Sequence, residues 1–172
     1  MKICVKSAAL PAAVIFILGV FGVATEVLPQ DKTIILVRHA EKVDSTSADP
    51  ELSEAGRDRA IALVRKIKKY RPGAIFSTDL KRTRDTARPI AAKRGKEIRI
   101  YDARQPGDLI DLIMASRTKR FVIVGHSNTI PVLANLIAKK ELFRNLEDAE
   151  YGTIWVIRIK KGAVKKIEIL SY

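Results

Sequence analysis

The sequence of 172 residues contains very little cysteine or histidine, with one cysteine and two histidines in all. Because the cysteine, Cys4, lies near the start of the chain, the rest of the sequence has no thiol for a disulfide bond, a thiolate metal site or nucleophilic attack. Two histidines cannot form a histidine-rich metal cluster either. We therefore expect no bound metal, no other cofactor, and a fold that is stabilised by packing.

Aromatic residues make up only 6% of the sequence, and they are not interleaved with the basic residues. The net charge of +13 favours an anionic partner, but without aromatic stacking platforms we do not expect a nucleic acid. Walker A and G-x-G-x-x-G patterns are also missing, which leaves nucleotide-driven chemistry without support. A phosphorylated small molecule or the phosphate-rich surface of a cell envelope fits the charge, and a basic surface without a partner is the alternative.

Charge is absent from residues 7–25, a run of 19 mostly apolar residues that follows two lysines. A basic head, an apolar body and small residues before a cleavage point are typical of a secretory signal, which predicts a signal peptide over residues 1–24. The run is also long enough to be retained as a membrane anchor, with association at the membrane surface. In either case we expect residues 25–172 to form one exported domain, periplasmic or attached to a membrane.

Apolar runs of strand length alternate with longer amphipathic segments along the rest of the sequence. The spacing predicts strands over residues 33–37, 74–78, 97–101 and 120–124, helices over 52–70, 80–94, 106–117 and 129–140, and a strand hairpin over 153–170. Such alternation favours an α/β fold in which helices cover both faces of a mostly parallel central sheet. We predict this three-layer sandwich, ended by the C-terminal hairpin.

Both histidines directly follow predicted strands, His39 after the first and His126 after the fourth. The carboxyl ends of parallel strands meet at one edge of a sheet, and ligands bind at that edge. Arg38, Arg82 and Asp102 fall at the same predicted edge. We therefore expect one site that contains these five residues.

Two guanidinium groups and the amino end of a helix can bind the oxygens of a phosphate group. Cationic neighbours keep an imidazole neutral, so that His39 can attack phosphorus and form a phosphohistidine, which water then hydrolyses. The arginines would stabilise the transition state without a metal. The leaving oxygen needs a proton, for which Asp102 and Glu41 are the candidates. Asn128 either binds phosphate or starts the helix that follows it.

Three motifs in this order resemble the histidine phosphatase superfamily of phosphoglycerate mutase-like proteins: "LVRHAEK", "STDLKRTRDTA" and "VGHSNT". The resemblance implies that His39 is the phosphorylated residue and that His126 is the second catalytic histidine. It also implies that Arg38 and Arg82 hold the phosphate. A further segment, residues 52–56, is similar to a structural motif of the family.

The sequence departs from two branches of this family. Mutases carry an insertion with a glutamate proton donor after the third strand, which this chain lacks, so we do not expect mutase activity. Acid phosphatases and phytases place an aspartate directly after the second histidine, where Ser127 stands here. Asp102 is therefore assigned as the donor by its position alone. The chain looks most like the short bacterial branch, which contains phosphohistidine phosphatases and envelope phosphatases that act on lipopolysaccharide core sugars.

The resemblance and the site residues together predict an exported, metal-independent phosphatase that hydrolyses phosphomonoesters through a phosphohistidine on His39. The predicted export favours phosphorylated envelope sugars, such as those of the lipopolysaccharide core, as substrates. Two alternatives stay open. One is a phosphohistidine phosphatase of the same family, and the other is a noncatalytic module that uses the same cationic residues to bind phosphorylated envelope components.

Overall fold

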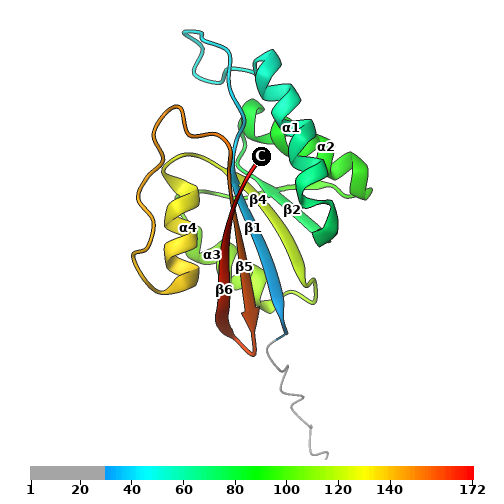
Figure 1. Cartoon of the computed structure of the whole chain (residues 1–172), viewed down its shortest axis with the longest axis vertical. Helices are drawn as coiled ribbons and strands as arrows, with labels where there is room; N and C mark the ends of the chain where they lie inside the picture. The colour runs from blue at the N-terminus through cyan, green and yellow to red at the C-terminus, as the bar shows by residue number, and fades with distance from the viewer. Residues whose placement is uncertain (1–29) are drawn as a thin grey trace, which may run out of the picture.

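Six strands and four α-helices alternate along residues 30–172, the part of the chain that the computed structural model describes (Figure 1). The strands are β1 (Lys32–Arg38), β2 (Ala74–Ser77), β3 (Ile98–Ile100), β4 (Arg120–Gly125), β5 (Thr153–Lys160) and β6 (Ala163–Ser171). The helices are α1 (Glu54–Ile67), α2 (Lys81–Arg94), α3 (Pro106–Ala115) and α4 (Thr129–Ala138), with a short 3₁₀ helix, η1 (Lys68–Tyr70). The predicted signal peptide or membrane anchor lies outside these residues. Within them, no helix is both long and apolar enough to cross a membrane.

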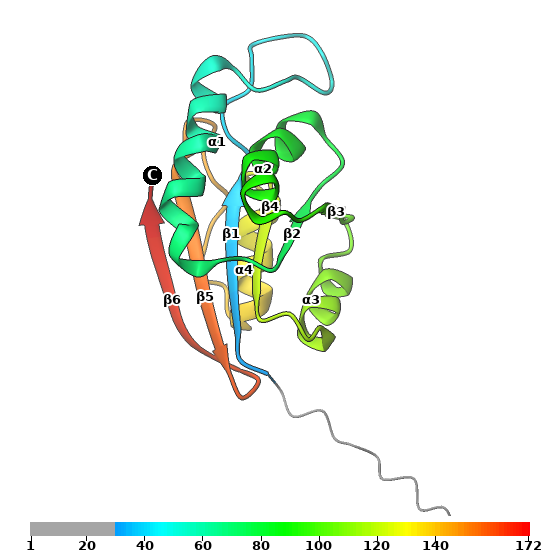
Figure 2. The same ribbon diagram turned by 90° about the vertical axis from the view of Figure 1, so that its right-hand side faces the viewer.

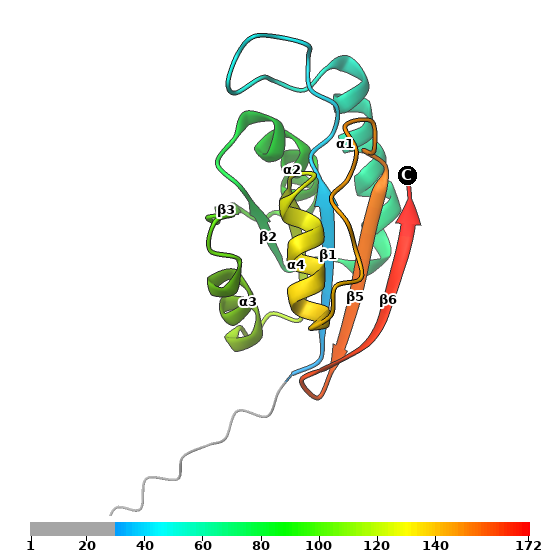
Figure 3. The same cartoon turned by 90° about the vertical axis from the view of Figure 1, so that its left-hand side faces the viewer.

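The strands form one sheet in the order β3-β2-β4-β1-β5-β6. Strands β1, β2, β3 and β4 run parallel, whereas β5 runs antiparallel to β1 and β6 antiparallel to β5. Figures 2 and 3 show α1 and α2 on one face of this sheet and α4 on the other. The predicted three-layer sandwich, with a mostly parallel sheet and a C-terminal hairpin, is confirmed.

The buried residues of β1 alternate between two cores. Ile34 and Leu36 belong to the core beneath α3 and α4, whereas Ile35 and Val37 belong to the core beneath α1 and α2. Successive side chains of a strand point to opposite faces, so a strand covered on both faces is apolar at every position. This explains the unbroken apolar run of β1, which gives way to charge only where the candidate site begins.

The predicted third strand is shorter than expected. β3 covers Ile98–Ile100 instead of residues 97–101, and it pairs on one side only because it is the edge of the sheet. Ile100 keeps half of its area exposed. The apolar residues that alternate with polar ones in this segment, Ile98 and Ile100, are therefore not buried on one face of the sheet.

The loop after β1 is fastened to the start of α1. Ser53 is the N-cap residue, and its Oγ accepts a hydrogen bond from Gly56 N–H at 3.1 Å. A Cβ atom at Gly56 would lie only 2.1 Å from the carbonyl oxygen of Glu41, so a side chain cannot be accommodated there. Leu52 is buried against Ala40. These contacts give residues 52–56 the structural role that the resemblance implies.

Candidate active site

The carboxyl ends of β1 and β4 bring the two histidines together. His39 N–H donates a hydrogen bond to the carbonyl oxygen of Gly125 at 2.9 Å. Arg38 is paired in register with the same glycine. The ring centroids of His39 and His126 lie 5.4 Å apart, with 65° between the ring planes. The two histidines therefore lie at one edge of the sheet, as the parallel arrangement predicts.

His39 is buried, and one hydrogen bond defines the proton on its ring. Its Nδ1 lies 2.7 Å from the carbonyl oxygen of Ala40. Because a carbonyl only accepts hydrogen bonds, Nδ1 carries the proton and Nε2 keeps a lone pair. The Ala40 backbone is held by Thr86, whose Oγ1 accepts from Ala40 N–H at 2.9 Å and donates to the carbonyl of Arg82 at 2.7 Å. Thr86 thus joins the segment of His39 to that of Arg82.

Two threonines orient His126. Thr83 Oγ1 lies 2.9 Å from the carbonyl oxygen of Thr78 and 2.8 Å from that of Leu80, so the Thr83 hydroxyl proton is donated to a carbonyl. Thr83 Oγ1 therefore accepts from the Thr78 hydroxyl at 3.0 Å. The Thr78 oxygen in turn accepts from His126 Nε2 at 2.8 Å. When neutral, the His126 ring thus carries its proton on Nε2 and a lone pair on Nδ1.

Arg38 is held by the loop that precedes β5, and its side chain is only 4% exposed. Its Nη1 donates to the carbonyl oxygens of Glu147, Asp148 and Glu150 at 2.8, 3.2 and 3.2 Å. The ring of Tyr151 covers the guanidinium group, whose carbon lies 4.1 Å from the ring centroid. These contacts fix the plane of the guanidinium group.

Arg82 lies in the first turn of α2, with its side chain 16% exposed. Its Nε and Nη1, like Nε of Arg38, have no hydrogen-bond partner within residues 30–172. The Asp49 carboxylate lies 3.8 Å from Arg82 Nη1 and also accepts from Lys81 N–H at 2.9 Å. Since buried N–H groups normally have partners, these free donors indicate a binding site for an anion.

A family model accounts for this arrangement of residues. Residues 34–105 match the model of the histidine phosphatase superfamily, branch 1. Over this range, 72 of the 172 residues, the chain is similar to the histidine phosphatase superfamily. The matched range includes Arg38, His39 and Arg82, and His126 lies beyond it in the sequence but beside His39 in the structure.

A curated protein and several solved structures are similar to this chain. A metal-independent phosphoserine phosphatase of Arabidopsis thaliana is 38% identical over 65 residues, which cover 34% of this chain and 27% of the plant protein. The chain thus spans about a quarter of the curated relative that it matches.

Two solved structures share the fold of this chain. The protein histidine phosphatase SixA, complexed with tungstate, superposes with a TM-score of 0.67 at 10% identity, covering 81% of this chain and 96% of SixA. A mycobacterial glucosyl-3-phosphoglycerate phosphatase superposes with a TM-score of 0.63 at 15% identity, covering 83% of this chain and 99% of that one. At these identities the two structures establish a common fold.

Both imidazoles are neutral at physiological pH. Burial, together with the neighbouring His126, Arg38 and Arg82, lowers the pKa of His39 to about 3 against the opposing effect of the Ala40 hydrogen bond. Burial also lowers the pKa of His126 to about 4, with contributions from Arg82 and Arg38. His39 is therefore a free base with an available Nε2 lone pair.

Both predicted proton donors are paired with an arginine. Asp102 is exposed, and hydrogen bonds from Arg104 Nε (3.0 Å) and Nη2 (2.7 Å) lower its pKa to about 2. For Glu41, burial raises the pKa, but hydrogen bonds from Arg59 Nε at 2.7 and 2.8 Å outweigh this effect and leave the pKa below its usual value. Both carboxylates are ionised at neutral pH. That Asp102 or Glu41 supplies the proton stays a prediction.

Asn128 occupies the N-cap position of α4, but its side chain makes no capping hydrogen bond. Thr129 Oγ1 accepts from His126 N–H at 2.9 Å instead. Of the two predicted roles, that of starting the helix through its side chain is therefore wrong. Phosphate binding by the Asn128 amide stays a prediction.

The sequence reasoning assigned no role to Tyr151 or Thr83, and it used Thr86 only as a residue of the second motif. Thr83 and Thr86 are fully buried on one side of α2, and two hydroxyls three residues apart on a buried helix face are a signal that could have identified them. Tyr151 reaches the site from a loop far along the chain from Arg38, and no local pattern indicates that contact.

The free energy of unfolding should decrease as the pH falls from about 7 to about 5.5. In this range the unfolded chain protonates both histidines, whose ordinary pKa is 6.5, whereas the folded chain does not. Because the unfolded state binds more protons, unfolding takes up about one proton per histidine. Urea unfolding at several pH values measures this slope. A variant with both His39→Asn and His126→Asn should lose most of it, and an unchanged slope would contradict the neutral state of the rings.

Proposed function

We propose that this protein is a phosphatase that hydrolyses phosphomonoesters through a phosphohistidine on His39 Nε2. One observation carries the proposal: a buried imidazole with a free Nε2 lone pair lies among arginine N–H groups that have no partner in the described chain. A neutral nucleophile beside unsatisfied cationic donors suits a phosphoryl dianion, because the donors hold its oxygens while the nucleophile approaches phosphorus.

The proposed reaction has two steps. In the first, the His39 Nε2 lone pair bonds to phosphorus, the bond from phosphorus to the ester oxygen breaks, and its electron pair leaves with that oxygen. Arg38 and Arg82 stabilise the charge on the three phosphoryl oxygens. In the second step, the oxygen of a water molecule bonds to phosphorus, the P–N bond breaks, and the water proton passes to His126. Phosphate leaves and His39 regains its lone pair.

The leaving oxygen of the first step requires a proton, and the carboxylates of Asp102 and Glu41 are ionised at neutral pH. A bound phosphate dianion raises the pKa of an adjacent imidazole, because the opposite charge favours the protonated form. His126 is therefore the proposed acid. A site that depends on an imidazolium acid favours leaving groups that depart readily.

Phosphorylated envelope sugars are the first proposed substrates. Export, predicted from residues 1–24, and the basic composition support this class. The shared fold with glucosyl-3-phosphoglycerate phosphatase is consistent with a phosphorylated sugar derivative. Phosphohistidine is the second candidate, and the ionised state of Asp102 favours it, since an imidazole leaving group needs no carboxylic acid donor. SixA, with the same fold, is a protein histidine phosphatase.

The proposal is tested with the full-length protein in the presence of a chelator. We expect hydrolysis of p-nitrophenyl phosphate, and rapid quenching in alkali should trap a phosphohistidine. A panel of sugar phosphates, lipopolysaccharide core fragments and a phosphohistidine peptide then ranks the substrate classes. Binding of these compounds without turnover would reject the enzyme in favour of the noncatalytic module. Activity that disappears with the chelator would contradict metal independence.

Replacing Tyr151 by alanine should lower kcat/KM by about tenfold, because the substitution removes the ring that holds the Arg38 guanidinium group. Tyr151→Phe keeps the ring face and should retain nearly full activity. Steady-state kinetics of both variants, with thermal unfolding as a control for the fold, measure the difference. An equal loss in Tyr151→Phe would show that the hydroxyl group, not the stacking, is required.

A further inference from the structure

The positive charge of the protein is concentrated at the edge of the sheet opposite the candidate active site, where the parallel strands begin. We call this the basic edge and define it by residues 31–32, 65–73, 93–97, 116–120, 139–141 and 160–162. These ranges contain sixteen lysines and arginines but three acidic residues, so they carry the whole net charge of +13. The rest of the sequence contains sixteen residues of each kind.

Backbone contacts join the segments of the basic edge. Gly73 N–H donates to the carbonyl of Arg120 at 2.8 Å, and Thr33 N–H donates to the carbonyl of Lys119 at 2.8 Å. The turn between β5 and β6 lies beside the start of β1, as the pairing of Lys32 with Ile159 requires (Figure 1). The charges therefore lie on neighbouring loops at one end of the molecule.

The protein itself does not neutralise this charge. Within residues 30–172, none of the sixteen basic side chains of the basic edge forms an ion pair with a carboxylate. Lysines and arginines in the last turns of α1 and α2 are favourable for the helix dipoles. That effect does not explain the basic residues of 116–120 and 160–162, which lie outside helices.

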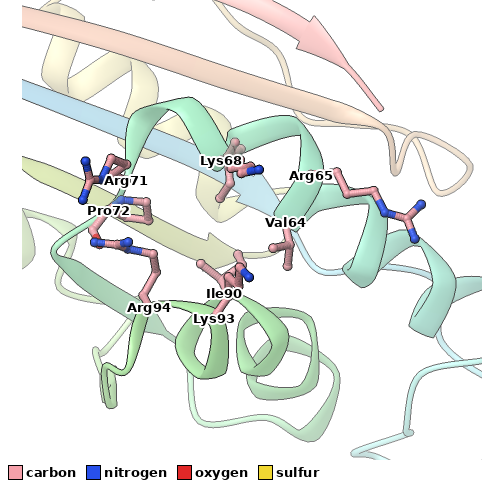
Figure 4. Close-up of a pocket in the computed structure, with 9 residues that line it drawn as sticks. Val64, Arg65, Lys68, Arg71, Pro72, Ile90, Lys93 and Arg94 are labelled. Carbon is pink, nitrogen blue, oxygen red and sulfur yellow. The ribbon is translucent and has the colours of Figure 1, made fainter.

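A pocket of about 540 Å³ opens in the basic edge, between the C-terminal ends of α1 and α2 (Figure 4). Five basic residues line it: Arg65, Lys68, Arg71, Lys93 and Arg94. Val64 and Ile90 contribute apolar surface between them. A cationic rim over an apolar floor is complementary to a phosphate group that is attached to an apolar body.

We propose that the basic edge binds the surface of a bilayer that contains anionic phospholipids, with a lipid head group in the pocket. The position of the chain start supports this choice of partner. Lys32 opens β1 at the basic edge, and only six residues separate it from the uncharged run of residues 7–25. An apolar run that precedes β1 in the sequence and a cationic surface where β1 begins favour the same partner, since a bilayer offers both an apolar interior and anionic head groups.

The test compares the binding of the full-length protein to two kinds of vesicle, phosphatidylcholine alone and an equal mixture of phosphatidylcholine and phosphatidylglycerol. The ratio of the two partition coefficients cancels the apolar contribution of residues 7–25, which is common to both. A variant with Arg65→Gln, Lys68→Gln and Lys93→Gln should lower this ratio by about 100-fold at low salt, since each basic residue near an anionic surface contributes about a fivefold factor.

The matched control removes the same charge elsewhere, with Lys42→Gln, Arg88→Gln and Arg104→Gln, all exposed and outside the basic edge. It should leave the ratio nearly unchanged. Hydrogen exchange on the mixed vesicles should show protection of residues 68–73 and 117–120 but not of residues 42–53. Equal ratios for the wild type and the basic-edge variant, an equal loss in the control, or displacement from the vesicles by stoichiometric RNA duplex would overturn the proposal.

Discussion

Replacing His39 by alanine is expected to lower kcat/KM for p-nitrophenyl phosphate by about 10⁴-fold or more, since the substitution removes the attacking atom itself. The arginines and His126 can stabilise a transition state only if a nucleophile reaches phosphorus. Water would have to attack phosphorus directly, with the neutral His126 as its general base, and water is a weaker nucleophile than an imidazole. The variant should also yield no phosphohistidine after rapid quenching.

Anion binding should survive the loss of His39. Arg38 and Arg82 keep their free N–H groups in the variant, so it should still bind tungstate, the anion bound in the SixA structure. Calorimetry with tungstate separates a lost nucleophile from a collapsed site, and His39→Gln, which keeps a polar side chain in the buried position, provides a second variant. Full activity in either variant would reject His39 as the nucleophile.

Replacing Arg82 by alanine is expected to lower kcat by about 10²- to 10³-fold, the usual cost of removing one donor from a preorganised anion site. Its Nε and Nη1 have no hydrogen-bond partner in the described chain, with the Asp49 carboxylate 3.8 Å from Nη1, so their hydrogen bonds are available to the phosphoryl oxygens. Arg82→Lys keeps the charge but not the planar pair of donors, and should recover only part of the activity.

Arg84 provides the control for this prediction. It lies two residues further along α2, is 40% exposed, and pairs with Asp79 at the surface. Because exposed ion pairs contribute little, Arg84→Ala should change the activity by less than about twofold. Equal losses for Arg82→Ala and Arg84→Ala would mean that the general basic charge of α2, and not a directed contact, supports the reaction.

The elements and the convergence of the histidines were predictable because they depend on backbone topology. An unbroken apolar run such as 121–124 indicates a strand covered on both faces. Because β1 and β4 are parallel neighbours, the residues that follow them lie at the same edge of the sheet, independent of how their side chains pack. Arg38, His39 and His126 could therefore be placed together without any knowledge of packing.

The features that could not be predicted depend on contacts between side chains. Asp102 follows a strand at the correct edge, but strand topology does not reveal its hydrogen bonds with the nearby Arg104. Tyr151 reaches Arg38 through the path of an irregular loop. β3 proved short because it pairs only with β2, which is itself four residues long.

β1 also has a consequence for the choice of substrate. Lys32 begins this strand at the basic edge and Arg38 ends it beside His39, and seven residues of extended strand span about 20 Å. With the basic edge against a bilayer, the strand would hold His39 at a fixed distance of about 20 Å from the lipid phosphates. The phosphates of that bilayer would then not reach the active site, so the substrates would be groups that project further from the membrane surface or soluble molecules.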